Sequence, residues 1–485
     1  MSSTHNHWRS RIGNALVLAL LAGLAAWLWT LQTSHWPTLA PQMDVRLAAG
    51  LSFTLWLVLC AVTLLLPRKK PAIKQQHTDD NTWHVIHASQ TGFALELAER
   101  SVRLLRDAGQ TAQLHDLGEL TPQQLQGKRC LFIASTTGEG DPPDTVLAFA
   151  KYIDAKHQHC IDFSTTQFAV LALGDSSYTE FCAFGHRLSR WLLEHGGTPL
   201  FDLIEVDNAA PGALQRWQQQ LANLAGQTDT SVWEAAQTQP WILAKRTLLN
   251  PGSQGWPAYH LVLKPFGSEK PQWQAGDIAE IHPTPQLQRD YSIASISSDG
   301  QIELLVRQMQ RSDGSPGLGS SWLCEQLNLG DTVPLRIRSN PNFHAPSPST
   351  PLILIGNGTG IAALRALTKA RAQEGAKQTW LIFGERSAAH DAFFGDELEH
   401  WLENGTLTHL NRTFSRDGHV QRYVQDALRA QSQRLQEWVN NGASLYICGS
   451  QEGMAPDVET ALNELLGETT VTTLRQTGRY RRDVY

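Results

Sequence analysis

Short apolar runs alternate with amphipathic segments between residues 83 and 226. His84–Ala88, Arg129–Ala134 and Phe168–Leu173 are apolar runs with the length of buried strands. Phe93–Ala108 and Gly185–His195 repeat apolar residues at helical spacing. Strands that alternate with helices predict an α/β fold with a doubly wound parallel sheet. The ligand loops of such a sheet lie at the carboxyl ends of its strands.

The pattern changes between residues 240 and 345. Short strands such as Tyr259–Lys264 and Ile302–Val306 are separated by Gly, Pro and Asp turns, which predicts an antiparallel β-barrel. Alternation of strands and helices returns at Pro351. A second α/β domain is therefore predicted over residues 346–485.

Two apolar segments, Ala15–Leu31 and Leu47–Leu66, precede these domains. At about 1.5 Å per residue they would extend about 25 and 30 Å, close to a hydrocarbon core of about 30 Å. We therefore predict a membrane anchor with two transmembrane helices over residues 1–66 and a polar linker over residues 67–82. For the first segment, a cleaved signal peptide is the alternative.

Basic residues flank the two segments on their outer sides, and the short loop between the segments holds only Arg46. By the positive-inside rule, both ends of the anchor face the inner side of the membrane. The predicted location is a bacterial-type inner (cytoplasmic) membrane, with the catalytic domains in the cytoplasm. The flanking basic residues are Arg9, Arg11, Arg68, Lys69, Lys70 and Lys74.

Length and composition limit the remaining possibilities. A chain of 485 residues is long enough for about three folded units. A formal net charge of −6 gives no support to a nucleic-acid partner. The six cysteines include no Cys-x-x-Cys pair, so no disulfide framework, zinc site or iron–sulfur cluster is predicted.

A loop with the chemistry of an anion site follows the first predicted strand. In Ser89–Ala94, backbone N–H groups at a helix start and hydroxyl groups can bind a phosphate. The loop lacks the Lys of a nucleoside-triphosphate loop, which favours a monophosphate such as that of FMN. An ordinary strand–helix turn is the alternative.

Two more loops follow the second and third predicted strands. Their glycines admit a flat ring, on which Tyr178 could stack while Asp175 accepts hydrogen bonds. The alternative for Tyr178 is a half-buried surface aromatic. Convergence of three loops at one edge predicts an FMN site. Its candidate residues are Ser89, Gln90, Thr91, Gly92, Phe93, Ala94, Ser135, Thr136, Thr137, Gly138, Leu173, Gly174, Asp175, Ser176, Ser177, Tyr178, Thr179, Glu180, Phe181 and Cys182.

A second flavin site is predicted in the region of short strands. Arg289, Tyr291 and Ser292 share one strand, where they can neutralise a pyrophosphate, cover a flavin ring and bond to its reactive edge. The loop Gly317–Ser321 opens a predicted helix over Trp322–Leu327 and offers further N–H groups. Together these features favour FAD. The alternative is an ordinary barrel strand whose Arg faces solvent.

A nicotinamide nucleotide site is predicted in the last domain. Gly356–Gly360 is a phosphate turn after an apolar strand. Arg416 follows a later strand, where an Arg can pair with the 2′-phosphate that distinguishes NADPH from NADH. Arg422 and Tyr423 come soon after. A solvated loop arginine is the alternative for Arg416.

Three residues are candidates for catalysis. Cys448 ends another apolar strand at the same edge, and Ser292 could bond to the flavin. Tyr485 follows a charged run, and we expect its ring to cover FAD and to shift when nicotinamide approaches. The alternatives are a buried structural Cys and a C-terminal strand packed on its domain.

From Trp83 to Tyr485 the chain resembles the diflavin reductases, and most of all the flavoprotein subunit of NADPH-dependent sulfite reductase. The resemblance implies a flavodoxin-like FMN domain (83–226), an FAD-binding β-barrel domain (240–345) and a Rossmann-like NADP domain (346–485) of the ferredoxin-NADP reductase type. With the residues above, it implies cofactor contacts from Asp290, Leu305, Val306, Arg307, Gly317, Leu318, Gly319, Ser320, Gly358, Thr359, Gly360, Ser415, Arg416, Gln421, Arg422, Tyr423, Val424, Gln425 and Asp457.

The sequence departs from the family pattern at particular places. Phe93 replaces a frequent Asn, and Gln421 occupies a position that is usually basic. The interval Lys245–Arg289 is too short for the helical connecting insert of the larger diflavin enzymes. The paired N-terminal apolar segments are foreign to the sulfite reductase flavoprotein.

The resemblance, together with the two apolar segments, predicts a membrane-anchored NADPH-dependent diflavin reductase. Electrons would pass from NADPH to FAD, then to FMN, then to a one-electron acceptor in a haem protein or metal centre. The alternatives are a sulfite reductase flavoprotein that docks a soluble sirohaem protein, and a ferric-siderophore reductase. A flavin-binding membrane scaffold without activity is the non-enzymatic alternative.

Overall fold

The computed structural model describes residues 82–155, 161–176, 178–227, 237–267, 271–284, 287–310, 314–418 and 420–485. The chain divides into two units, Met1–His77 and Thr78–Tyr485. The predicted membrane segments and residues 67–81 of the predicted linker lie outside the described residues.

The predicted membrane location is wrong. No helix among the described residues is long and apolar enough to cross a bilayer. The physical reason is length and polarity. The longest helices of these ranges, α3 (Phe93–Asp107) and α6 (Pro211–Ala225), have 15 residues each and carry polar faces. A span needs about 20 predominantly apolar residues.

The first sheet is parallel, as the α/β pattern predicts. Its order is β2-β1-β3-β4-β5, and β6 also pairs with β4. Strand β1 is buried at all of its positions, which is typical of a sheet covered on both faces. The strands are β1 (Trp83–Ala88), β2 (Ala112–Asp116), β3 (Arg129–Ser135), β4 (Gln167–Gly174), β5 (Thr198–Pro199) and β6 (Ile204–Asp207).

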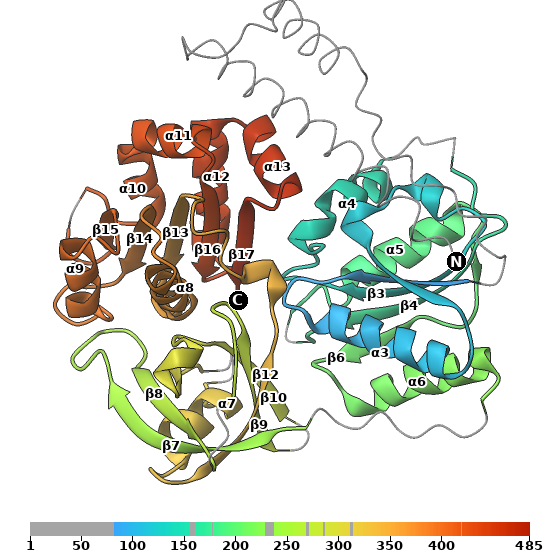
Figure 1. Cartoon of the computed structure of the whole chain (residues 1–485), viewed down its shortest axis with the longest axis horizontal. Helices are drawn as coiled ribbons and strands as arrows, with labels where there is room; N and C mark the ends of the chain where they lie inside the picture. Colours follow the sequence, from blue (N-terminus) through green and yellow to red (C-terminus); the bar gives the residue numbers. More distant parts are fainter. Residues whose placement is uncertain are drawn as a thin grey trace, which may run out of the picture. The chain divides into compact units, whose positions relative to one another are not determined.

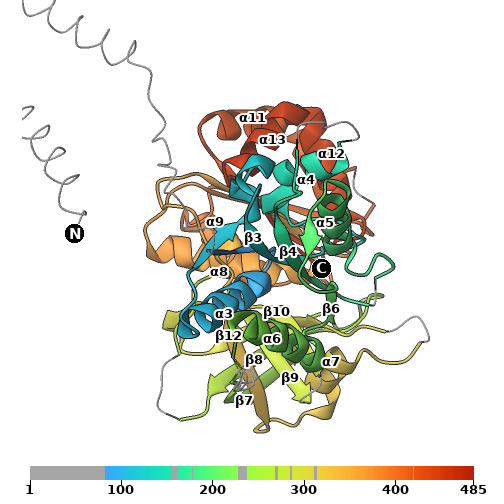
Figure 2. The ribbon, with the colours of Figure 1, turned by 90° about the vertical axis from the view of Figure 1, so that its right-hand side faces the viewer.

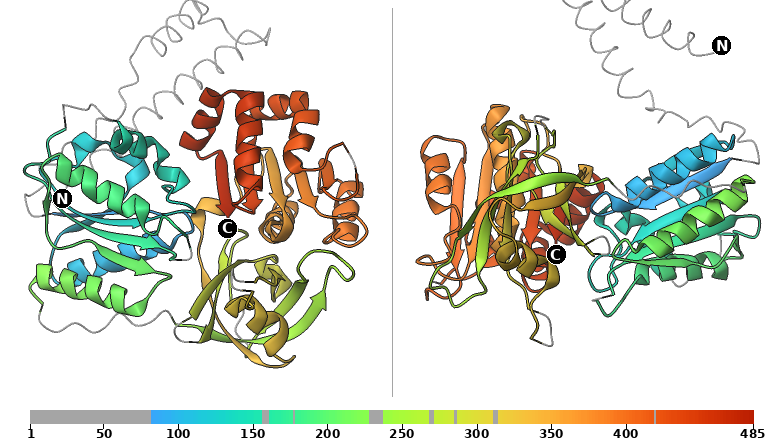
Figure 3. Two further views of the ribbon diagram at one scale, coloured as in Figure 1. Left: turned by 180° about the vertical axis from the view of Figure 1, so that it is seen from behind. Right: turned by 90° about the horizontal axis from the view of Figure 1, so that it is seen from below.

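Helices cover both faces of this sheet (Figures 1 and 3). Helices α3 and α6 pack on one face, and α4 (Leu147–Asp154) and α5 (Ala183–Glu194) pack on the other. The buried residues of α3 recur at helical spacing, which explains why this segment is an amphipathic helix. They are Ala94, Leu97, Ala98, Ser101, Val102 and Leu105.

The second sheet is antiparallel and six-stranded, with the order β10-β9-β12-β7-β8-β11. Its strands β7, β8, β9, β10 and β12 lie in the lower part of Figure 2. The sequence predicts an antiparallel β-barrel. In the described ranges, however, β10 and β11 end the path and form no ladder with each other. A single backbone bond, Ala294 N to Glu303 O at 2.8 Å, joins this end of the sheet. The strands are β7 (Gln239–Leu248), β8 (Ala258–Pro265), β9 (Ile278–Thr284), β10 (Leu287–Ser292), β11 (Ile302–Arg307) and β12 (Thr332–Arg338).

The helix predicted over Trp322–Leu327 begins earlier. A short helix α7 occupies Leu318–Ser321, and a π-helical turn follows over Trp322–Gln326. Glycine and serine have low helix propensity, so the sequence alone places the helix start too late.

The third sheet is parallel, with the order β15-β14-β13-β16-β17. Helices α8 and α9 cover one face, and α10 to α13 cover the other. The chain changes direction between β13 and β16, and such a switch point leaves a crevice at the carboxyl ends of the strands. The elements are β13 (Leu352–Asn357), α8 (Ile361–Gln373), β14 (Thr379–Glu385), α9 (Gly395–Glu403), β15 (His409–Phe414), α10 (Val424–Ala430), α11 (Ser432–Asn440), β16 (Ser444–Gly449), α12 (Met454–Leu466), α13 (Glu468–Gln476) and β17 (Tyr480–Val484).

The second and third sheets share one apolar core. Leu305 of β11 and Phe343 belong to the same buried cluster as α8 and α9. Arg365 of α8 also donates to Ala294 O at 2.7 Å and pairs with Glu303 at 2.9 Å. The two sheets therefore hold their facing residues in fixed positions.

Polar contacts join the first sheet to the other two. Arg482 of β17 pairs with Asp144, with Nε 2.8 Å from Oδ2. Gln90 Nε2 donates to Arg482 O at 2.8 Å, and Arg336 Nη1 lies 2.8 Å from Glu96 Oε1. The loop after β1 thus faces β17 and β12.

Candidate functional site

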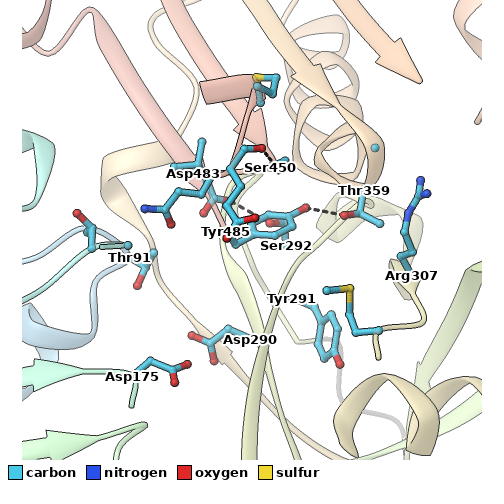
Figure 4. A pocket seen from close by; sticks show the side chains of 18 of the residues that line it. Thr91, Asp175, Asp290, Tyr291, Ser292, Arg307, Thr359, Ser450, Asp483 and Tyr485 are labelled. Atoms are coloured by element: carbon cyan, nitrogen blue, oxygen red, sulfur yellow. Dashed lines mark hydrogen bonds between the residues drawn. The ribbon is translucent and has the colours of Figure 1, made fainter. Parts of the chain in front are cut away.

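One cavity of about 1540 Å³ runs between the strand ends of the three sheets (Figure 4). All three predicted cofactor regions contribute to its wall. Thirty-five of the predicted cofactor residues line it. They are Gln90, Thr91, Phe93, Ser135, Thr136, Thr137, Gly138, Leu173, Gly174, Asp175, Ser176, Tyr178, Glu180, Phe181, Cys182, Arg289, Asp290, Tyr291, Ser292, Leu305, Val306, Arg307, Gly317, Leu318, Gly319, Ser320, Gly358, Thr359, Ser415, Arg422, Tyr423, Val424, Gln425, Asp457 and Tyr485.

Other predicted residues lie behind the wall or beside it. Ser89 and Ala94 are buried. Gly360 and Cys448 are buried beneath the wall, whereas Arg416 and Gln421 are exposed. Ser177 lies outside the described residues. The predicted residues that the structure does not bring to the cavity wall are Ser89, Gly92, Ala94, Thr179, Gly360, Arg416, Gln421 and Cys448.

The loop after β1 is shaped by its own side chains. Ser89 Oγ accepts a hydrogen bond from Gly92 N at 3.0 Å. Gly92 has φ +87°, a conformation that glycine adopts without strain. Ser89 and Gly92 therefore fix the turn at the start of α3, while Thr91 and Phe93 face the cavity.

Contacts between neighbouring loops shape the rest of this end. Thr136 N donates to Leu173 O at 2.9 Å, and Phe184 N donates to Thr136 Oγ1 at 3.2 Å. A Cβ at Gly174 would lie 2.8 Å from Cys182 N, so this position admits only glycine without a shift. The loops after β3 and β4 thus form one wall.

This wall fits FMN. Thr91, Thr136 and Thr137 line the cavity near the start of α3, and hydroxyl side chains beside a helix start suit a phosphate. Burial raises the pKa of Tyr178, so its phenol stays protonated at neutral pH. A neutral aromatic ring next to Gly174, the glycine that ends β4, suits a flat isoalloxazine ring.

The strand β10 and the α7 turn form the second wall. A Cβ at Gly319 would lie 2.6 Å from Arg289 Cγ and 3.2 Å from Tyr291 Oη, so the turn packs directly on β10. Arg289 donates to Gln288 O through Nη1 at 2.7 Å. Since a guanidinium carries five N–H donors, Arg289 retains others for a phosphate. Cation, aromatic ring and hydroxyl on one strand fit FAD.

The third wall lies at the ends of β13 and β15. Gly358 and Thr359 line the cavity after β13. Arg422 donates to Ser415 O through Nε at 3.2 Å and Nη2 at 3.1 Å. Gln425 Nε2 donates to Asp457 Oδ2 at 3.0 Å. A glycine turn with an arginine at the neighbouring strand end fits a phosphorylated dinucleotide.

Ser292, Asp483 and Cys448 converge where the second and third sheets meet. Ser292 Oγ donates to Asp483 Oδ2 at 2.9 Å, and Cys448 Sγ lies 3.8 Å from the same oxygen. Burial, together with the adjacent Asp483, raises the pKa of the Cys448 thiol well above its ordinary value. Burial also raises the pKa of Asp483. The three groups form a chain through which a proton can be held or moved.

Tyr485 covers this group from the cavity side. Its hydroxyl donates to Thr359 Oγ1 at 3.1 Å, and its backbone N donates to Gly449 O at 3.1 Å (Figure 4). The side chain is 51% exposed. Its backbone extends β17, and its ring lies in the cavity.

Sequence reasoning missed Asp483. Its signal is its position two residues before Tyr485, because residues i and i+2 of a strand point to the same face. It also missed Glu385 and Ser450, which line the cavity at the ends of β14 and β16. Each has one partner far away in sequence, Arg307 for Glu385 and Asn357 for Ser450, and no local motif marks these contacts.

Two protein families match parts of this chain. Residues 85–217 match the flavodoxin family, and residues 354–460 match the oxidoreductase NAD-binding domain family. The chain is 26% identical to a Vibrio cholerae protein named sulfite reductase [NADPH] flavoprotein alpha-component, over 98% of each chain. The protein of that name from Bacillus subtilis is 25% identical over 86% of this chain and 90% of its own. The one from Escherichia coli O157:H7 is 28% identical over 83% and 89%.

These comparisons, with the site, identify the kind of enzyme. The chain is an NADPH-dependent flavoprotein oxidoreductase that uses FMN, FAD and NADPH. The predictions of enzyme class and cofactors are confirmed. The two domain matches and the relatives support the diflavin reductase family.

Proposed function

We propose that this chain is the flavoprotein component of a sulfite reductase-type system, which delivers electrons from NADPH to a haem or metal centre of a separate protein. One observation carries the proposal. A single cavity is lined by the FMN, FAD and NADP candidate residues together, so the three cofactors would lie in one shared space. Two Vibrio cholerae relatives named sulfite reductase [NADPH] flavoprotein alpha-component match this chain over 98% of their own length. Their name supports a haem or metal centre as the electron acceptor.

Within the proposal, each wall has its own role. The loops after β1, β3 and β4 hold FMN, β10 and the α7 turn hold FAD, and the ends of β13 and β15 hold NADPH. A flavin, when bound, takes up two electrons together and releases them singly, which lets NADPH serve a one-electron acceptor. The residues of the chain position these groups and exclude water.

Asp483 and Tyr485 control the centre of the cavity. Asp483 orients Ser292 through the 2.9 Å hydrogen bond and shares its buried environment with Cys448. The Tyr485 ring occupies the place next to Thr359 that a nicotinamide would need. We infer that the ring moves aside before nicotinamide reaches Ser292.

The test uses the purified full chain. We expect one FMN and one FAD per chain, and NADPH-driven reduction of cytochrome c. Addition of a sirohaem protein and sulfite should then make NADPH oxidation depend on sulfite. A protein without either flavin would contradict the diflavin assignment. Rapid reduction of a ferric siderophore with no response to the sirohaem protein would contradict the acceptor.

Replacement of Arg416 by Ala tests the donor choice. Arg416 is exposed beside Ser415, which lines the cavity. We propose that it pairs with the 2′-phosphate of NADPH at the cavity mouth. The ratio of kcat/KM for NADPH over NADH should fall about tenfold, which is about 1.4 kcal/mol. Arg412→Met is the control, because Arg412 pairs with Glu399 away from the cavity. An unchanged ratio in Arg416→Ala would refute this role.

A further inference from the structure

An ion pair on the cavity wall joins the second sheet to the third. Arg307, the last residue of β11, pairs with Glu385, the last residue of β14. The side chains are 14% and 3% exposed, and both residues line the cavity. The family resemblance implied that Arg307 contacts FAD, because Leu305–Arg307 match a FAD-binding strand of that family. The contacts of Arg307 point elsewhere.

The contacts of the Arg307 guanidinium are with the third sheet and its loops. Besides Glu385, its carbon Cζ lies 5.6 Å from the centre of the Phe393 ring. A Cβ at Gly358 would lie 3.9 Å from Arg307 Nη2 and 3.6 Å from Glu385 Oε1. The glycine turn after β13 therefore lies directly against the ion pair. In Figure 4, Arg307 and Thr359 lie on the same side of the cavity.

The FAD wall has its own cation. Arg289 packs under the α7 turn, where a Cβ at Gly319 would lie 2.6 Å from Arg289 Cγ. Arg289 and Arg307 thus serve different glycine turns, one on the second sheet and one on the third. A pyrophosphate needs positive charge at its own turn, and Arg307 supplies that charge at Gly358.

Arg307 also keeps donors available. Among the described residues, its guanidinium donates only through Nη2, to Glu385 Oε1. The other Glu385 oxygen, Oε2, accepts from Arg386 N at 2.9 Å, which anchors the carboxylate to its own backbone. Since a guanidinium has five N–H groups, an anchored carboxylate can orient it while the remaining donors face a ligand.

We propose that Arg307 binds the pyrophosphate of the nicotinamide dinucleotide, and that Glu385 positions it for this role. The inference rests on the proposed NADPH site and adds a specific residue to it. It makes Arg307 a bridge between sheets: the side chain comes from the FAD-binding sheet, and the ligand lies on the NADP-binding sheet. Binding of the dinucleotide would then tie the two sheets together at their shared edge.

The test separates the pyrophosphate from the rest of the dinucleotide. Adenosine 2′-phosphate carries the 2′-phosphate and the adenosine but no pyrophosphate. In Arg307→Met, the Kd of NADP⁺ measured by calorimetry should rise about tenfold or more, and the Kd of adenosine 2′-phosphate should not change. Removal of Arg307 alone leaves Glu385 buried and unpaired. The double variant Arg307→Met with Glu385→Gln is therefore measured beside it, with the same expectation.

Two further variants sharpen the result. Arg307→Lys keeps the positive charge but replaces the planar fork by a point charge, so its NADP⁺ affinity should lie between those of wild type and Arg307→Met. Arg412→Met removes a half-buried arginine of the same domain that pairs with Glu399 outside the cavity, and it should bind both ligands as wild type does.

Three outcomes would overturn the inference. If the NADP⁺ affinity stays at the wild-type value in Arg307→Met and in the double variant, Arg307 does not bind the pyrophosphate. Equal weakening of NADP⁺ and adenosine 2′-phosphate indicates a general distortion of the domain. If the variant loses FAD, and the molecules that retain FAD bind NADP⁺ with unchanged affinity, Arg307 belongs to the FAD site instead. If wild type binds neither ligand, the proposed NADPH site itself fails, which is a separate result.

Discussion

Asp483→Asn should lower kcat with NADPH about 100-fold, the low end of the range for a group that handles a proton. Asp483 accepts from Ser292 Oγ at 2.9 Å and lies 3.8 Å from Cys448 Sγ. An amide keeps the shape of the side chain but cannot take up a proton. The loss should appear in kcat, with little change in the Kd of NADP⁺.

The same substitution should not lower stability. Burial raises the folded pKa of Asp483 above its ordinary 3.8, so the unfolded chain gives up this proton more easily. The carboxyl group therefore makes the folded state less stable as pH rises from the unfolded pKa of Asp483 through its folded pKa. An uncharged amide removes this cost, and Tm at pH 7 should be unchanged or higher. Wild-type turnover in Asp483→Asn, or a loss of turnover that follows only from a loss of FAD, would contradict the proposed role.

Gly360→Ala should unfold the NADP-binding region or abolish its ligand binding. A Cβ at this position would lie 2.2 Å from Cys448 O and 2.7 Å from Gly449 N, both of which are backbone atoms. Neither can move without separating β13 from β16. Overpacking of a core costs about 1–3 kcal/mol, and contact with rigid backbone should place this variant at the upper end or beyond. Thermal unfolding and calorimetric titration with NADP⁺ measure the two effects.

Gly212→Ala is the matched control. Gly212 lies in the first turn of α6, and a Cβ there would meet no atom within 4 Å. Alanine should stabilise this helix by about 0.5–1 kcal/mol, because it restricts the unfolded chain. If Gly360→Ala matched this control in Tm and in NADP⁺ affinity, the close approach of Gly360 to β16 would not matter.

Local patterns predicted much of the fold. The runs chosen as strands at residues 84–88, 129–134 and 168–173 lie within β1, β3 and β4. The helix predicted over residues 93–108 is α3 to within one residue at its end. Buried parallel strands and amphipathic helices have periodicities that a sequence displays directly. The predicted β-barrel is not shown closed, because β10 and β11 form no ladder among the described residues. Pairing between two such distant strands has no local signal in the sequence.

In the candidate site, too, local features were predicted and contacts between distant segments were not. Loops at strand ends were predicted because glycine, serine and threonine mark them, and most of their residues line the cavity. Contacts between distant segments were not predicted. Asp483 meets Ser292 across 191 positions, and Arg307 meets Glu385 across 78 positions. Such pairs depend on how the sheets pack against each other, which no single stretch of sequence encodes.

The last strand, β17, gives its two neighbouring charged residues opposite tasks. Arg482 points to Asp144 on the first sheet, whereas Asp483 points inward to Ser292. Because successive side chains of a strand alternate, a shift of one residue along β16 would move each side chain to the opposite face. A shift that brought Arg482 to the place of Asp483 would put a guanidinium beside Ser292 and would leave Arg481 opposite Asp144. The number of residues between α13 and β17 therefore decides which charge lies beside Ser292.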